Sequence, residues 1–344
     1  MKFAICFMMN AEIKMLKDNT DEVVVSVTLV TYNHEKFIEK AMRSILSQKT
    51  NYCYELIVGD DASTDKTPKI IKKIADEYPN IVVPVLREKN LGATRNGYDL
   101  WCRAKGKYII SCDGDDCWCD DNRIQEQVDF LETHPEYGGV CGRVRLIDET
   151  DSPLPDDIMG NSSFFVFERD EFTREDFEKW LMPGHVSAMM LRFDFAKKKK
   201  MKDVFLSHST VGDRISVLYG LLMGNIYCTQ NIVMCYRILN TGNFMTQYQK
   251  KNLRDEDVRM MQAIENFIHK ECDGSFSLES IKKDRFVAAI SIWLKKNTKR
   301  NRQVLWNIWS ESDKKLIYSW ILIKTIAIKL YYWYILHEDR KIEI

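Results

Sequence analysis

Tyr108-Ile-Ile-Ser-Cys-Asp-Gly-Asp-Asp116 is a short apolar run that ends in three carboxylates. The apolar part has the length and composition of a buried strand. Burying an unpaired charge is expensive, so three neighbouring carboxylates indicate that a cation belongs at the end of this strand. Carboxylate oxygens are the ligands that Mg²⁺ and Mn²⁺ prefer, and these ions also hold phosphates. In open α/β sheets, ligands bind at the carboxyl ends of the strands, which is where Asp113, Asp115 and Asp116 stand.

Strands and helices alternate around this stretch. The β-branched residues 23–31 predict a strand, and Asn33 could cap a helix whose buried face carries Phe37, Ala41 and Ile45. Further strands are expected at 55–59, 81–86, 108–112, 139–146, 187–191 and 231–236, and further helices at 66–78, 92–104 and 122–133. The alternation predicts an α/β fold with an open, mostly parallel sheet and helices on both faces. From about residue 250 the pattern predicts a C-terminal helical extension.

The chain has 344 residues, of which 45% are hydrophobic, and its formal net charge is +0. This composition suits a large core and does not fit an intrinsically disordered protein. Without a net positive charge, binding to nucleic acid through general electrostatics is not expected. The ten cysteines include no CxxC pair and do not resemble a disulfide framework. We therefore expect reduced cysteines and a cytoplasmic location, and the apolar start Met1–Met9 shows no small-residue cleavage site of a secretory signal.

Asp60-Asp61-Ala-Ser-Thr-Asp65 forms a second acidic cluster, directly after the expected strand at 55–59. On its own it is best interpreted as an acidic turn that caps the next helix through Thr64 or Asp65. Parallel strands, however, bring their carboxyl ends to one edge of the sheet, so this cluster should meet Asp113–Asp116 there. A carboxylate at that edge can accept the N–H of a nucleobase while a metal ion holds the diphosphate. The two clusters together therefore predict a nucleotide site.

Five motifs of the chain resemble those of family 2 glycosyltransferases with the GT-A fold. They are Val27-Thr-Leu-Val-Thr-Tyr-Asn33, Ala41-Met-Arg-Ser-Ile-Leu-Ser-Gln48, Glu55-Leu-Ile-Val-Gly-Asp-Asp-Ala-Ser-Thr-Asp65, Asn90-Leu-Gly-Ala-Thr-Arg-Asn96 and Asp113-Gly-Asp-Asp-Cys-Trp118. Each is weak alone, but five in the family's order and spacing are specific. The resemblance implies an N-terminal extension at 1–22, a GT-A domain at 23–245 and a C-terminal helical region at 246–344. Within the domain, it implies a nucleotide-sugar-binding half at 23–135 and an acceptor half at 136–245.

The resemblance also implies a reaction, the inverting transfer of a hexose from a nucleotide-diphosphate sugar to an acceptor hydroxyl. The donor would be a UDP-sugar, and the acceptor a glycan or lipid-linked molecule of surface polysaccharide or glycolipid assembly. Asp61 would read the base, Thr31 and Tyr32 would line the nucleoside pocket, and Arg95 would lie near the donor. For Arg95, an ordinary surface arginine on a helix is an equally good interpretation.

The same resemblance assigns roles to the remaining carboxylates. Asp113 and Asp115 would form the Asp-x-Asp motif that holds Mn²⁺ or Mg²⁺, with Asp115 as the direct ligand. Asp116 would contact the ribose or the sugar, or share the metal. The family often carries a histidine that can reach the metal or diphosphate, two residues after the arginine at the position of Arg237. Here Leu239 stands in that place.

The general base implied by the resemblance is Asp213, which would take the proton of the acceptor hydroxyl. The family has an acidic pair at this point, and Gly212-Asp213 keeps only its second member. The plain alternative is an aspartate favoured at a helix N-terminus by the helix dipole. Should Asp213 not be the base, Asp156 and Asp157 in the preceding loop are the next candidates.

Three other functions compete with glycosyl transfer. A sugar nucleotidyltransferase usually has a glycine-rich loop after its first strand, whereas Thr31-Tyr-Asn-His-Glu35 has no glycine. A dinucleotide-binding oxidoreductase needs GxGxxG after a strand, and the sequence has none. A non-catalytic GT-A-like protein would have no need of Asp61, Asp113, Asp115 and Asp213, which are all present.

Leu316–Leu336 is the most apolar segment and is rich in Trp and Tyr. Lys324 and Lys329 interrupt it, and each would cost about 2.5–3.5 kcal/mol at the centre of a bilayer, so a spanning helix is not expected. The first interpretation is a terminal helix that packs on the protein. The second is a helix that lies on a membrane surface, with aromatic side chains at the headgroups and lysines near anionic lipid. The protein would then be peripheral at the inner face of the membrane.

Overall fold

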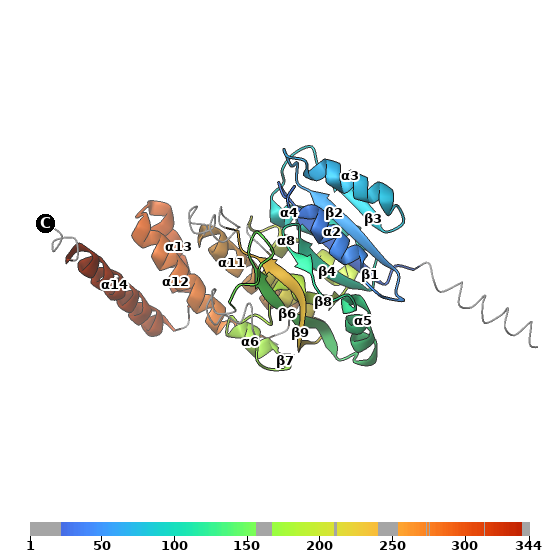
Figure 1. Cartoon of the computed structure of the whole chain (residues 1–344). Helices are drawn as coiled ribbons and strands as arrows, with labels where there is room; N and C mark the ends of the chain where they lie inside the picture. The colour runs from blue at the N-terminus through green and yellow to red at the C-terminus, as the bar shows by residue number, and fades with distance from the viewer. Residues whose placement is uncertain are drawn as a thin grey trace, which may run out of the picture. The chain divides into compact units, whose positions relative to one another are not determined.

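The computed structural model describes residues 22–155, 167–209, 212–239, 254–272, 274, 276–312 and 314–338. The expected N-terminal extension, apart from residue 22, and the alternative bases Asp156 and Asp157 lie outside these residues. The described residues up to 239 form one compact unit, and those from 254 on form a second, to which Glu178–Trp180 also belong (Figure 1).

Four parallel strands form the first half of the sheet, in the order β3-β2-β1-β4. They are β1 (Val25–Thr31), β2 (Tyr54–Asp60), β3 (Val82–Leu86) and β4 (Tyr108–Asp113). Thr31 pairs with Asp60, and Val30 pairs with Asp113. The carboxyl ends of β1, β2 and β4 therefore coincide, and the two acidic clusters meet at one edge of the sheet as predicted.

The second half of the sheet is mixed. Its strands are β5 (Cys117–Trp118), β6 (Tyr137–Ile147), β7 (Glu171–Phe172), β8 (Met189–Arg192) and β9 (Asn225–Arg237). β8 is antiparallel to β4 and β6, β9 is parallel to β6, and β5 and β7 are antiparallel to β9. The nine strands of the described residues thus form one sheet, and the predicted α/β class is confirmed. The two-residue strands β5 and β7 were not predicted because so short a segment shows no periodicity.

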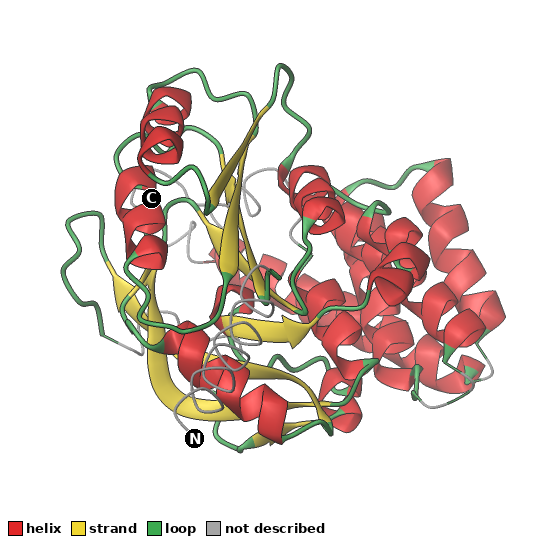
Figure 2. Cartoon of the chain, turned by 90° about the vertical axis from the view of Figure 1, so that its right-hand side faces the viewer, coloured by secondary structure: helices red, strands yellow, loops and turns green. Residues whose placement is uncertain are grey.

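Helices cover the sheet in this unit (Figure 2). Those of the first half are α2 (Ile38–Leu46), α3 (Thr67–Glu77), α4 (Ala93–Arg103) and α5 (Arg123–Thr133). β1 is almost entirely buried, as expected for a parallel strand covered on both faces. α2 buries Ile38, Ala41 and Ile45, which recur every three to four residues.

The prediction that Asn33 caps α2 is wrong. The helix begins after Phe37, which makes no capping side-chain bond. Asn33 instead adopts a left-handed backbone with φ 57°, a conformation that asparagine tolerates better than most residues. Its Oδ1 accepts a hydrogen bond from Thr64 N at 2.8 Å. Asn33 therefore joins the loops that follow β1 and β2.

Short helices follow β6 in the same unit, apart from Glu178 at the end of α6, which belongs to the second unit. They are α6 (Arg174–Glu178), the 3₁₀ helix η2 (Val186–Ala188), α7 (Phe195–Lys200), α8 (Lys202–Phe205) and α9 (Asp213–Leu221). α9 is buried along most of its length, from Ile215 to Leu221. It therefore provides a rigid support for Asp213 at its first position.

The second unit is helical, as predicted. It comprises α11 (Arg254–Glu271), α12 (Glu279–Lys295), α13 (Lys299–Glu311) and α14 (Lys315–Glu338). Its core gathers Phe286 and Ile290 of α12, Ile308 of α13, and Tyr318 and Ile321 of α14. None of the helices in the described part of the chain combines the length and the apolar character that a membrane crossing requires.

Candidate active site

The acidic loop after β4 packs tightly against the end of β1. Gly114 N donates to Val30 O at 2.9 Å. A Cβ atom at Gly114 would lie 2.5 Å from Thr31 Oγ1 and 3.0 Å from His34 Nδ1, so only glycine allows this approach. The glycine between the first two carboxylates is therefore needed to bring Asp113 and Asp115 beside the end of β1.

The carboxylates of this loop lie close enough to repel one another. Asp116 is only 2% exposed, and its Oδ1 accepts a hydrogen bond from Arg237 N at 2.9 Å while its Oδ2 has no partner. Burial, followed by the charges of Asp115 and Asp113, raises the pKa of Asp116 well above its usual range. Burial, followed by the charges of Asp115 and Asp213, raises the pKa of Asp113 to about 8. A bound cation would relieve this repulsion.

Arg237, the last residue of β9, organises the acidic loop. Its buried guanidinium donates from Nε to Asp115 O at 2.7 Å, from Nη1 to Asp148 O at 2.8 Å and from Nη2 to Asp151 Oδ1 at 2.7 Å. The bonds hold the loop backbone and leave the Asp115 carboxylate free of the arginine. The sequence assigns no role to Arg237 itself, because nothing local shows that β9 ends beside residue 115.

His34 is a second residue of the site that no sequence motif indicates. Its Nε2 lies 4.0 Å from Asp115 Oδ2, and its buried Nδ1 has no hydrogen-bond partner. The backbone N–H of His34 donates to Thr67 Oγ1 at 3.0 Å, which fixes the residue at the sheet edge. A histidine therefore does reach the acidic loop, although it comes from the loop after β1 and not from position 239.

Asp61 is almost fully buried and binds the loop that precedes α4. Its Oδ1 accepts from Leu91 N at 2.7 Å, and its Oδ2 accepts from Gly92 N at 2.8 Å. Gly92 has φ 85°, a backbone that other residues adopt only with strain. Both oxygens of Asp61 are thus engaged within the protein, although a carboxylate oxygen has a second lone pair for a further donor.

The other predicted donor residues lie around the same edge. Thr31 ends β1 and is buried, with an Oγ1 that has no partner. Tyr32 follows it and is 46% exposed. Arg95 is exposed in the first turn of α4 and makes no hydrogen bond or ion pair with any residue that the structure describes. The structure therefore brings Thr31 and Tyr32 to the acidic edge and leaves Arg95 free to contact a ligand.

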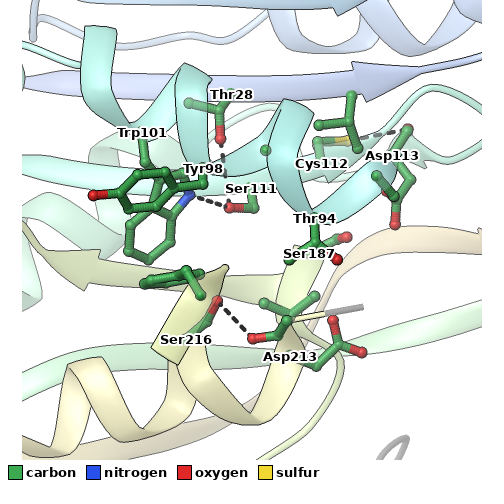
Figure 3. Close-up of a pocket in the computed structure, with 16 residues that line it drawn as sticks. Thr28, Thr94, Tyr98, Trp101, Ser111, Cys112, Asp113, Ser187, Asp213 and Ser216 are labelled. Carbon is green, nitrogen blue, oxygen red and sulfur yellow. Dashed lines mark hydrogen bonds between the residues drawn. The ribbon is translucent and has the colours of Figure 1, made fainter. Parts of the chain in front are cut away.

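Asp213 approaches the acidic loop from the other side of a cavity. It is the first residue of α9 and follows Gly212. Burial raises its pKa to about 6, a shift that the charge of Arg214 and a backbone hydrogen bond oppose. Asp113 and Asp213 both line a cavity of about 90 Å³ between α4, the ends of β1 and β4, and α9 (Figure 3). A carboxylate with this pKa can accept a proton near neutral pH.

The residues that the structure describes do not form a complete metal site by themselves. Among the described residues, no group of three or more His, Cys, Asp or Glu side chains is arranged to hold an ion. Asp113 and Asp115 are hard oxygen ligands in an acidic loop, which fits Mg²⁺ or Mn²⁺. These ions usually complete their coordination with water and substrate phosphates. The residues therefore fit a cation that arrives together with a diphosphate.

Comparisons with known proteins point to one family. The family model described as glycosyl transferase family 2 matches residues 26–198, about half of the chain. That range contains every predicted donor and metal residue and ends before Asp213. The chain is 39% identical to an uncharacterised protein of Mycobacterium tuberculosis over 134 residues, 38% of this chain and 39% of that protein. It is 34% identical to TuaG of Bacillus subtilis, a putative teichuronic acid biosynthesis glycosyltransferase, over 108 residues, 31% of this chain and 42% of TuaG.

The chain thus spans about two fifths of the length of these curated relatives. The solved structure of S. aureus TarS 1-349 in complex with UDP-GlcNAc has a similar fold, with a TM-score of 0.57 and 16% identity. That likeness covers 83% of this chain and 80% of the TarS chain. The family match, the order of the motifs and the position of the acidic loop agree, and the chain belongs to glycosyl transferase family 2.

Proposed function

We propose that this glycosyltransferase is an inverting, metal-dependent enzyme that transfers a hexose from a UDP-sugar to an acceptor hydroxyl. The observation that carries the proposal is that Asp213 lines the same cavity as Asp113, the carboxylate that ends β4. The acceptor is a glycan or lipid-linked molecule of cell-surface polysaccharide or glycolipid assembly. The similarity to TuaG, a putative teichuronic acid biosynthesis glycosyltransferase, supports this acceptor class.

The donor would be held at the edge formed by β1, β2 and β4. Thr31 and Tyr32 line the nucleoside side, and Asp61 accepts the N–H of the base with a free lone pair while it holds Leu91 and Gly92. Asp113 and Asp115 would hold a divalent cation beside the diphosphate, with Asp116 toward the ribose or sugar. Arg95 reaches the donor from α4.

The reaction breaks the bond between the anomeric carbon and the diphosphate and forms a bond to the acceptor oxygen. Asp213 accepts the proton of the acceptor hydroxyl as that oxygen attacks from the face opposite the leaving diphosphate, so the configuration inverts. A divalent cation, when bound, would neutralise the negative charge that grows on the diphosphate. Arg237 fixes the backbone of Asp115 and leaves its carboxylate free to hold such a cation.

The C-terminal helices supply a second part of the proposal, contact with an anionic membrane surface. α14 buries Tyr318 and Ile321 but exposes Leu316 (88%), Trp320 (60%) and Ile323 (66%), which share one helix face. Lys324 Nζ lies 4.9 Å from the Trp320 ring. From 295 to 338 the chain has nine Lys or Arg and three Asp or Glu. Apolar and basic groups together suit an interfacial helix, so the enzyme would be peripheral at the inner face of the membrane.

A thermal-shift screen tests the proposed donor and metal together. UDP, GDP, CDP and dTDP are each added with Mn²⁺, with Mg²⁺ or with a chelator, because a ligand of the native state raises the melting temperature by mass action. We expect the largest rise with UDP and a divalent cation. A rise with UDP that is the same in chelator would refute metal dependence, and a larger rise with another nucleotide would refute the UDP assignment.

A further inference from the structure

The cavity that opens at Asp113 and Asp213 ends against aromatic side chains. The Trp101 and Phe205 rings lie 5.2 Å apart, and the Tyr98 and Phe205 rings lie 5.4 Å apart. All three residues line the cavity, and Trp101 closes it beneath α4 (Figure 3). A volume of about 90 Å³ is well above the roughly 10–15 Å³ that a cavity needs to hold one water, and it is enough for a small group of atoms.

Most polar groups that line the cavity are already satisfied by the protein. Trp101 Nε1 donates to Ser111 Oγ at 3.0 Å, Thr28 Oγ1 donates to Ile110 O at 3.2 Å, and Ser216 Oγ donates to Gly212 O at 3.3 Å. These bonds leave the inner end of the cavity with aromatic and aliphatic surface and few free hydrogen-bonding groups.

Ser187 is different. It is 1% exposed and lines the cavity, and its Oγ has no hydrogen-bond partner. Its backbone is fixed on both sides, because Ser187 N donates to His185 Nδ1 at 3.2 Å and Arg123 Nη2 donates to Ser187 O at 2.8 Å. Burial lowers the pKa of His185 to about 3, so its ring is neutral and can accept this bond. A buried hydroxyl without a partner is costly, and here it is held in place facing the cavity.

We propose that this cavity receives the N-acyl group of the donor sugar, so that the enzyme is selective for N-acylhexosamine donors. The Ser187 hydroxyl donates to the acyl carbonyl oxygen, and the acyl methyl group lies against Trp101 and Phe205. The inference rests on the proposed function, which places the sugar between Asp113 and Asp213. A sugar with a hydroxyl in place of the N-acyl group would leave the aromatic surface of the cavity unfilled. A sugar with only hydrogen at that position would also leave the Ser187 hydroxyl without a hydrogen-bond partner.

Isothermal calorimetry with Mn²⁺ tests the inference, using UDP, UDP-glucose and UDP-N-acetylglucosamine as probes on the full chain. The quantity of interest is the ratio of the dissociation constants of the two sugars. We expect UDP-N-acetylglucosamine to bind about tenfold more tightly than UDP-glucose. Ser187→Ala should reduce that ratio by about three- to tenfold, the usual worth of one hydrogen bond.

A second variant fills the cavity without disturbing the helix. A Cβ at Gly97 of α4 meets only Val30 Cγ1 at 3.7 Å, an ordinary contact, so Gly97→Leu places its side chain in the cavity. This variant should abolish the selectivity, and UDP binding reports whether its nucleotide site has folded. Ser47→Ala, which removes a hydroxyl from the exposed end of α2, is the matched control.

The outcomes separate the inference from the proposed function. If the wild-type protein binds UDP but binds both sugars equally, or keeps its selectivity in Ser187→Ala and Gly97→Leu, the N-acyl assignment is overturned and the nucleotide site stands. If neither UDP nor its sugars bind in the presence of Mn²⁺, the proposed function fails and the inference fails with it.

Discussion

The acidic edge of the sheet and the outer face of α14 violate opposite rules of protein packing. At the sheet edge, the polar atoms Thr31 Oγ1, His34 Nδ1 and Asp116 Oδ2 are buried without partners. On α14, the apolar side chains of Leu316, Trp320 and Ile323 are exposed without cover. Buried unsatisfied polar groups and exposed apolar patches both reduce stability, and both mark surfaces that bind something else. The first surface suits a small polar ligand, and the second suits an extended apolar and anionic one.

The helical unit shows that the difference does not come from a general looseness of packing. Its buried charges are fully paired, since Arg285 donates to Glu265 through Nε at 2.7 Å and through Nη2 at 2.9 Å. Among its described residues no buried side-chain polar atom lacks a partner. Unpaired polar groups are therefore concentrated in the sheet unit, where the proposed donor binds.

The largest expected effect comes from removing the proposed base. Asp213→Asn is nearly isosteric, so UDP binding should persist, but an amide cannot accept the acceptor's proton and transfer should fall about 10²–10⁴-fold. Transfer and donor hydrolysis are measured separately, because water can reach an exposed anomeric carbon. Asp203→Asn, at an exposed position of α8, is the control. Transfer near the wild-type rate would assign the base to another carboxylate, with Asp156 and Asp157 next in line.

Removing the divalent cation with a chelator should have the next largest effect, which is a loss of UDP affinity at the sheet edge. The Asp115 carboxylate, together with whatever fraction of Asp113 and Asp116 is ionised, repels a diphosphate, and at an effective dielectric constant near 20 one charge pair 4 Å apart is worth about 4 kcal/mol. We therefore expect UDP to bind about 10²–10³-fold more weakly in chelator than in Mn²⁺, by calorimetry. In the Asp115→Asn variant, the UDP affinities in Mn²⁺ and in chelator should be nearly equal. Equal affinities in both conditions would contradict the metal assignment.

Asp61→Ala should weaken UDP binding by about 1–3 kcal/mol, because the base N–H loses its acceptor. The variant also frees the backbone N–H groups of Leu91 and Gly92. Titrations with UDP and GDP distinguish the two roles. A loss confined to UDP supports base reading, whereas an equal loss for both nucleotides would leave Asp61 as a support of the loop before α4.

The exposed face of α14 can be changed by substitution without altering the core of the helical unit. Trp320→Glu combined with Ile323→Glu should reduce flotation with anionic liposomes about tenfold or more, since each side chain contributes about 1.5–3 kcal/mol when buried. Val83→Glu, at an exposed apolar residue of β3, is the control, and the melting temperature should not change. Deleting residues 310–344 is a poorer test because it also removes Tyr318 and Ile321 from the core. Failure of the wild-type protein to bind liposomes would leave α14 as a packing helix.

The smallest expected effect is on the pH profile. With the pKa of Asp213 raised to about 6, the base is ionised at neutral pH and becomes protonated as the pH falls. The transfer rate should therefore drop to about half its plateau near pH 6 and decline further below it. The profile is recorded with donor hydrolysis as the reference reaction. A plateau that continues unchanged to pH 5 would mean that proton removal by Asp213 does not limit the reaction.

Local sequence pattern was sufficient for much of the sheet unit. Apolar runs of strand length before Asp60 and Asp113 predicted β2 and β4, and parallel pairing then required their acidic ends to share an edge. The prediction holds because a buried parallel strand needs apolar residues on both faces, which leaves a strong signal in the sequence. Helix α2 was placed by the spacing of Ala41 and Ile45, but its start was missed because Asn33 bonds across to Thr64 instead.

Sequence alone therefore determined the family, the α/β class and the position of the two acidic clusters, since each depends on neighbouring residues. Tertiary structure decided which partners surround them. Arg237 reaches Asp115 across 122 positions, His34 enters from another loop, and Ser187 faces the cavity from η2. Such contacts depend on how β1 and β9 are positioned in one sheet and on where η2 lies beside it. A linear pattern does not encode distances between elements far apart in the chain.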